Sequence, residues 1–77
     1  MAKKKGFEPK VFRQRFRQLC KETRLNQMQL AAKIGLTQAS VSRYLGGSPP
    51  NVSAMVRIAR GFGVSLDWLC GLKNKRK

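Results

Sequence analysis

The side chains of this chain that can do chemistry are cations and hydrogen-bond donors rather than acids, bases or nucleophiles. The sequence has no histidine, and its three carboxylates, Glu8, Glu22 and Asp67, are scattered. Cys20 and Cys70 stand alone, without the CxxC pair or histidine that a zinc site would need. Neither an acid–base pair nor a nucleophile beside a base can be assembled from this set. The sequence therefore predicts a binding protein, not an enzyme, without a metal or cofactor and with both thiols reduced.

The net charge points to a polyanionic partner. Seventeen Lys and Arg residues stand against three Asp and Glu residues, which gives a formal charge of +14. Such an excess favours nucleic acid or another anionic surface as the partner. The charge is concentrated at the two ends, where neither segment has an apolar face to bury. We expect a basic N-terminal arm at residues 1–8, a folded domain at 9–72 and a basic C-terminal tail at 73–77.

The stretch LTQASVSRYLGG, residues 36–47, contains the side chains best suited to contact such a partner. On a helix, Val41, Tyr44 and Leu45 fall on one side, whereas Ala39, Ser42 and Arg43 fall on the other. The first side is apolar and is expected to face a core. The second side is small, polar and nearly uncharged, and it needs a different explanation.

Five short helices with recognisable ends must position this stretch, and no segment alternates as a strand would. The first helix carries an apolar stripe of Phe12, Phe16, Leu19 and Cys20. Pro9 is the expected first residue of that helix. The expected N-caps of the four helices that follow are Asn26, Thr37, Asn51 and Ser65. Gln29 completes a capping box with Asn26, and Gly35, Gly46–Gly47 and Gly63 are expected stops. The predicted fold is all-α, one compact five-helix domain.

The turn between the second and third helices is only three residues long, Gly35 to Thr37. A short turn with glycine joins two helices at a steep angle and leaves the second one protruding, which is a helix-turn-helix. Other small helical bundles also have short turns, so the spacing alone leaves both arrangements open.

The run LNQMQLAAKIGLTQASVSRYLGG, followed by MVRIARGFGVSLDWLCG, resembles the phage repressor and Cro family of helix-turn-helix domains, the lambda repressor-like family. The resemblance covers roughly residues 12 to 71, with several matching segments in order. It implies a repressor-like transcriptional regulator of a phage or prokaryote. Such a protein places its third helix in the major groove of a palindromic operator in double-stranded DNA, as a homodimer. It would be cytoplasmic and nucleoid-associated, since no apolar run is long enough to span a membrane and no signal-peptide core follows MAKKK.

The resemblance also assigns roles to individual side chains. Gln38 can pair with adenine, Ala39 can contact a thymine methyl, and Arg43 can reach guanine or a phosphate. The expected base-contacting residues are Gln38, Ala39, Ser42 and Arg43. The expected backbone-contacting residues are Gln27, Thr37, Ser40, Lys3, Lys4, Lys5, Lys10 and Arg13. Trp68 and Leu72 are the expected dimer patch, with a packed core as the alternative for Trp68.

The chain departs from the family at two positions that often carry an inward Arg–Glu ion pair. Cys20 and Leu45 stand there instead, so an apolar contact between them is expected. The loop 46–51 also lacks the basic residues that often grip phosphate, and the N-terminal MAKKKG, which resembles the arm of lambda repressor, can compensate.

Several other functions are compatible with the same residues. An antitoxin-like or adaptor protein would use this fold to bind another protein, with the fifth helix as its docking face. An RNA-binding protein would need more exposed aromatic side chains. A membrane-surface protein would have to rely on the first helix, the one strongly amphipathic basic segment. The outer face of residues 38–43 and Gln27 can also be simply solvated.

Overall fold

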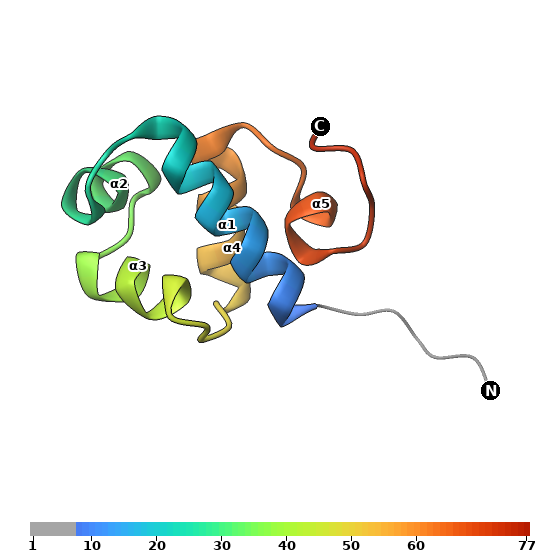
Figure 1. Cartoon of the computed structure of the whole chain (residues 1–77), viewed down its shortest axis with the longest axis horizontal. Coiled ribbons are helices and arrows are strands. Elements are labelled where there is room, and N and C mark those ends of the chain that lie inside the picture. Colours follow the sequence, from blue (N-terminus) through green and yellow to red (C-terminus); the bar gives the residue numbers. More distant parts are fainter. Residues whose placement is uncertain (1–7) are drawn as a thin grey trace.

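The computed structural model describes residues 8–77, which form a bundle of five helices (Figure 1). The helices are α1 (Pro9–Thr23), α2 (Gln27–Ile34), α3 (Gln38–Leu45), α4 (Val52–Phe62) and α5 (Leu66–Cys70). Within residues 8–77 there is no strand, and no helix is long and apolar enough to cross a membrane. The predicted all-α, five-helix fold is confirmed. Lys3, Lys4 and Lys5 lie outside the described residues.

Each helix begins at the residue that the sequence indicates. Pro9 opens α1, and the side chains of Asn26, Thr37, Asn51 and Ser65 each accept a hydrogen bond from a first-turn backbone N–H. The capping box is present: Asn26 Oδ1 accepts from the Gln29 backbone N–H at 2.8 Å, and the Asn26 N–H donates to Gln29 Oε1 at 3.0 Å. These bonds satisfy amides that the helices themselves leave unpaired.

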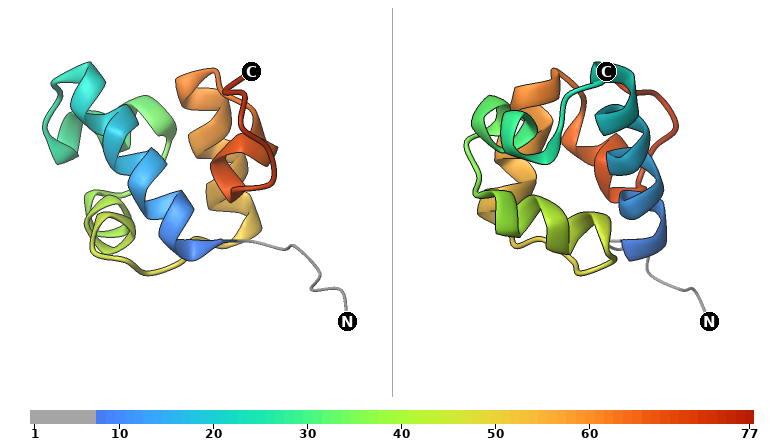
Figure 2. Two further views of the ribbon diagram at one scale, coloured as in Figure 1. Left: turned by 45° about the vertical axis from the view of Figure 1, so that its right-hand side comes forward. Right: turned by 60° about the vertical axis from the view of Figure 1, so that its left-hand side comes forward.

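The helix α1 packs against α3 and α5, while α4 packs against α2 and α5, so that the five helices enclose one core (Figure 2). Phe12 and Phe16 of α1 are fully buried, and their rings stack with centroids 5.4 Å apart. Tyr44 of α3 packs edge-on against both rings. Because α3 is anchored through this aromatic cluster, the orientation of α3 is set by the core.

Trp68 of α5 belongs to the core, which was the alternative to its role in a dimer patch. Only 5% of its surface is exposed, and its neighbour Leu69 is fully buried. The guanidinium of Arg15 lies 4.8 Å from the centre of the indole ring and that of Arg76 lies 5.3 Å from it. Trp68 therefore has little surface left to offer a second copy of the chain.

The C-terminal tail, residues 73–77, is exposed but is held against the domain by backbone and side-chain contacts: the Lys73 carbonyl accepts from Arg15 at 3.0 Å and the Arg76 carbonyl accepts from the Ser65 N–H. Arg76 pairs with Glu22 of α1 at 2.9 Å, in addition to its contact with Trp68. Hydrogen bonds from Arg76 and Gln18 lower the pKa of the Glu22 carboxyl below its ordinary value. The sequence predicts a solvated tail because its residues are polar, and it does not reveal this anchor.

Candidate nucleic-acid interface

The α2–turn–α3 unit is fixed by hydrogen bonds at the turn as well as by its core contacts. Gly35 adopts a left-handed conformation with φ of 72°, and its N–H donates to the Ala31 carbonyl at the end of α2. The N–H of Leu36 donates to the same carbonyl at 2.9 Å. The side chain of Arg57, from α4, donates to the Gly35 carbonyl at 3.2 Å. The angle between α2 and α3 is thus fixed by hydrogen bonds within the turn and by one hydrogen bond from α4.

The outer face of α3 is the surface that this unit presents. Gln38, Ala39, Ser42 and Arg43 are all exposed, whereas Val41 is fully buried. The division of this helix into an apolar inner side and a small polar outer side is therefore confirmed. Gln38 and Arg43 are separated by more than one helical turn, so together they cover most of the length of the face.

Two hydroxyl groups at the start of α3 are already engaged with each other. Thr37 Oγ1 accepts from the backbone N–H of Ser40 at 3.1 Å and donates to Ser40 Oγ at 3.0 Å. A hydroxyl has a single hydrogen to donate, so the Thr37 hydroxyl is committed to Ser40. Ser40 is therefore the member of this pair whose hydrogen can point outward to an anion.

The cations predicted near this face lie on α1. Lys10 and Arg13 are exposed, and Arg13 Nε donates to the carbonyl of Leu45 at the last turn of α3, at a distance of 3.0 Å. This bond ties the basic side of α1 to the end of α3. Gln27, at the first position of α2, is half-buried.

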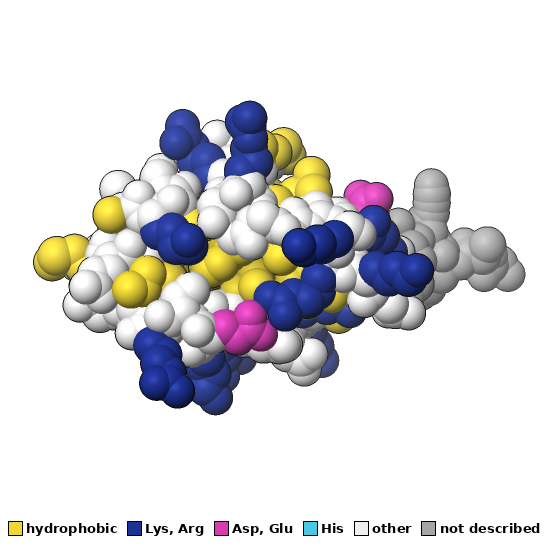
Figure 3. Space-filling model, turned by 90° about the horizontal axis from the view of Figure 1, so that it is seen from above, with side chains coloured by type: hydrophobic (Ala, Val, Ile, Leu, Met, Phe, Trp, Pro, Cys, Tyr) yellow, Lys and Arg dark blue, Asp and Glu magenta, His cyan; other side chains and the backbone are white. Residues whose placement is uncertain are grey.

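Two further cations, Arg17 and Lys21, continue the row that Arg13 begins. A hollow of about 350 Å³ is lined by Lys10, Arg13, Gln14 and Arg17, and another beside it by Gln14, Arg17, Gln18 and Lys21. The spacing of four residues places Arg13, Arg17 and Lys21 on one helical face, but Arg17 and Lys21 were not among the expected DNA contacts. On the face seen in Figure 3, Lys and Arg side chains are widely spread, with few carboxylates among them.

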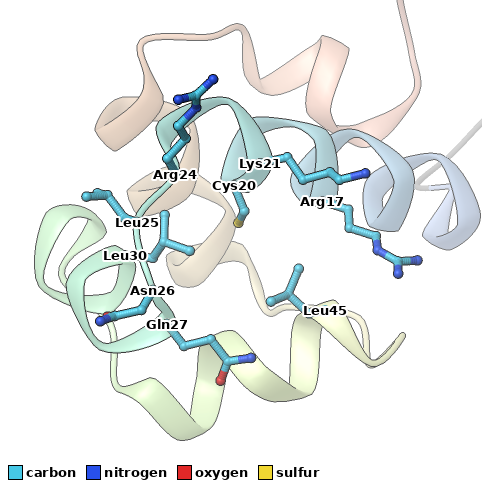
Figure 4. A pocket seen from close by; sticks show the side chains of 9 residues that line it. All are labelled: Arg17, Cys20, Lys21, Arg24, Leu25, Asn26, Gln27, Leu30 and Leu45. Carbon is cyan, nitrogen blue, oxygen red and sulfur yellow. The ribbon is translucent and has the colours of Figure 1, made fainter.

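Cys20 and Leu45 lie on facing walls of the same open hollow, between α1, the start of α2 and the end of α3 (Figure 4). Their side chains point toward one another across it. Burial raises the pKa of the Cys20 thiol to about 11, so this group is neutral at physiological pH. The direct contact expected between the two side chains stays a prediction.

Among residues 8–77, no group of three or more His, Cys, Asp or Glu side chains is arranged to hold a metal ion.

Comparison with known proteins agrees with the geometry of the α2–turn–α3 unit. The helix-turn-helix family profile matches residues 16–69, which include α2, α3 and α4 in full. The chain is also 40% identical over 63 residues to the "Uncharacterized HTH-type transcriptional regulator YobD" of Bacillus subtilis (strain 168). That similarity covers 80% of this chain and 56% of the relative, so this chain spans little more than half of the relative's length.

Proposed function

Because this chain belongs to the helix-turn-helix family of lambda repressor and Cro type, we propose that it is a sequence-specific, double-stranded DNA-binding regulator of transcription. It places α3 in the major groove of a palindromic operator and acts in the manner of a repressor, in the cytoplasm and associated with the nucleoid. The observation that carries this proposal is the outer face of α3, which is exposed, small and polar on a helix whose inner face is locked in the core. A bulky or acidic face would clash with or repel the duplex.

Base reading falls to four side chains of this face. Gln38 can donate to N7 and accept from N6 of adenine in a bidentate pair, and Arg43 can pair with O6 and N7 of guanine. Ala39 offers a methyl group to the methyl of thymine, and Ser42 is short enough to bond to a base edge beside it. Since α3 is held rigidly by Val41 and Tyr44, these groups meet the groove without a large loss of conformational entropy.

Contacts to the DNA backbone set the register of the protein on the duplex. Gln27 and the first-turn amides of α2 face a phosphate, which the positive end of a helix favours. Thr37 and Ser40 supply a second contact at the start of α3, with Ser40 as the donor. Lys10 and Arg13 follow the backbone along α1, and Lys3, Lys4 and Lys5, which lie outside the described residues, extend it. Backbone contacts of this kind contribute affinity without sequence preference.

The regulator acts as a homodimer, so that a palindromic site is read by two copies of α3. The region around α5 supports this part of the proposal, because Leu72 is 47% exposed and Leu66 is 38% exposed, so both offer apolar surface that a second copy could cover. Trp68 contributes to the proposed dimer surface indirectly, because its buried side chain holds α5 on the core.

Selection of bound sequences from a random double-stranded DNA pool tests the proposal. We expect a consensus with two inverted halves whose centres are about 10 base pairs apart, one helical turn. A single asymmetric half would retain the DNA-binding function but remove the homodimer. No enrichment over the starting pool would contradict the proposed function and favour an adaptor that binds another protein through the same fold.

A further inference from the structure

The hollow between α1, the start of α2 and the end of α3 has the size of a small-molecule site. Its volume is about 600 Å³, within the range of roughly 300 to 1,000 Å³ that ligand pockets occupy. Figure 4 shows that Leu30, Leu45 and the sulfur of Cys20 point into it from three different helices. The contacts described above for the outer face of α3 do not use its interior.

The floor of this hollow is apolar. Leu30 and Cys20 belong to the buried core, and Leu25 and Leu45 are partly buried against it. The Cys20 thiol is neutral, so it adds no charge to the floor. Leu25 and Leu45 provide most of the apolar surface that is in contact with water, because Leu30 and Cys20 are almost fully covered. An apolar group of a ligand would remove that surface from water.

The rim of the hollow is cationic. Arg17, Lys21 and Arg24 line it, all three exposed, and among residues 8–77 no carboxylate lines it. Glu22, which follows Lys21 in the sequence, is paired instead with Arg76 on another side of α1. An anionic group is therefore attracted to the mouth of the hollow and meets no repulsion there.

We propose that this hollow binds a small amphipathic anion, with an apolar body on the floor and a carboxylate or sulfonate at the rim. The phosphodiester backbone of DNA is hydrophilic throughout and would leave the floor of Leu30, Leu45 and Cys20 exposed. Gln27 and Asn26 also line the hollow, so its occupant lies beside the α2 end at which DNA phosphate is proposed to sit. The anion therefore competes with DNA, a consequence that rests on the proposed function.

The test uses two fluorescent probes with the same kind of apolar body, 8-anilinonaphthalene-1-sulfonate, which is anionic, and N-phenyl-1-naphthylamine, which is neutral. The anionic probe should bind the whole chain at least about tenfold more tightly, and it should raise the unfolding temperature because it binds the folded state. Backbone amide NMR signals of Cys20, Leu30 and Leu45 should shift with saturation.

Matched charge-neutralising variants locate the anionic group. Arg17→Gln combined with Lys21→Gln should weaken binding of the anionic probe about three- to tenfold, the effect of losing two exposed ion pairs. Lys33→Gln combined with Arg60→Gln removes the same charge from exposed positions outside the hollow and should change binding less than about twofold. Circular dichroism checks that both variants keep their helical content.

Three results would overturn the site: equal binding of the two probes, equal losses in the two double variants, or NMR shifts at the apolar groove of Val52 and Leu66 in place of the hollow. Competition with DNA is measured separately, by the anisotropy of a labelled duplex with and without saturating anionic probe. An unchanged affinity for DNA would remove the coupling but leave the site. A chain that binds the probe but no DNA would contradict the proposed function alone.

Discussion

At the scale of single residues, the outer face of α3 and the hollow beside it are shaped by what small side chains leave open. Ala39 and Ser42 are exposed and short, so the longer Gln38 and Arg43 are the side chains with the greatest reach from this face. Cys20 and Leu45 are likewise short and uncharged, and they face each other across the hollow. On the proposed function, the short side chains of Ala39 and Ser42 leave the base edges accessible. The short side chains of Cys20 and Leu45 leave an unfilled volume between three helices.

The first prediction concerns Cys20 and Leu45. In a closed core, either Cys20→Arg or Leu45→Glu would cost about 3 kcal/mol or more, because a charge would be buried without a partner. The hollow is open to water, so we expect each single variant to lose only about 1 to 2 kcal/mol of unfolding free energy. The double variant should recover at least about 0.5 kcal/mol of the summed loss, since the two charges face each other.

Urea denaturation of the wild type, both single variants and the double variant measures this coupling. The combination of Cys20→Arg with Leu45→Gln is the control. Gln has nearly the same shape as Glu but carries no charge, so it cannot form an ion pair with the Arg at position 20. Strictly additive losses in the charged double variant would show that the two side chains do not meet across the hollow.

At the scale of elements, the position of α2 depends on a close approach that the sequence analysis did not identify. Gly61 lies within α4 where that helix crosses α2. A Cβ atom at Gly61 would stand 2.6 Å from Ile34 Cγ2 and 3.1 Å from Ile34 Cα. Both distances are shorter than van der Waals contact, so only glycine allows α4 to approach the end of α2 this closely.

The second prediction is that Gly61→Ala destabilises the fold although alanine is the better helix former. The gain in helix propensity is about 1 kcal/mol, whereas overpacking costs roughly 1 to 3 kcal/mol. We expect a net loss of about 1 kcal/mol in unfolding free energy, measured by urea denaturation. In an Ile34→Ala background, which removes Cγ2 but keeps the 3.1 Å approaches to Cα and Cβ, the same substitution should cost less than in the wild type. An equal loss in both backgrounds would show that the contact with Ile34 is not the cause.

The sequence predicted elements far better than it predicted the distances between them. The caps at Asn26, Thr37, Asn51 and Ser65 have a local cause, the pairing of first-turn amides, and each was confirmed. The inner face of α3 follows from helical periodicity alone. The approach of Gly61 to Ile34 depends on how two helices cross, which periodicity does not encode.

The same distinction applies to the candidate site. The outer side chains of α3 could be predicted because each one follows from its position on a single helix. The hollow at Cys20 and Leu45 and the anchoring of Arg76 on Glu22 and Trp68 involve elements distant in the sequence. Arg24 also ends α1 in a left-handed conformation with φ of 60°, a conformation that glycine adopts more readily, so composition gave no signal there.

At the scale of the whole molecule, the charge of +14 is the dominant property. The middle of the chain carries few of the cations, and much of the charge lies in the N-terminal arm, along α1 and in the tail. A charge of this size steers the protein to any polyanion, whatever its sequence. On the proposed function, we therefore expect affinity for DNA and selectivity among DNA sequences to reside in different parts of the protein.

The third prediction separates these two contributions. Deletion of residues 1–6 removes Lys3, Lys4 and Lys5, and each phosphate contact contributes about 0.9 to the slope of log affinity against log salt concentration. We expect the slope to fall by up to about 2.7, with equal weakening on operator and random DNA, because flexible lysines carry no planar fork to match a base edge.

Salt titrations of the full and the shortened chain on both DNAs check this expectation. An unchanged slope would mean that the arm does not contact phosphate. Weakening on the operator alone would mean that the arm reads bases, as its resemblance to the arm of lambda repressor also allows.

The central claim, that the outer face of α3 reads base sequence, is tested most directly by Gln38→Ala on a selected operator and on a scrambled duplex at one salt concentration. We expect a loss of about 1 to 3 kcal/mol on the operator and almost none on the scrambled duplex, because the bidentate contact to a base is lost while the phosphate contacts remain. Asn74→Ala, which removes an exposed neutral amide outside the proposed interface, is the control and should change neither affinity. Equal losses on both duplexes with Gln38→Ala would contradict the claim and reduce Gln38 to a backbone contact.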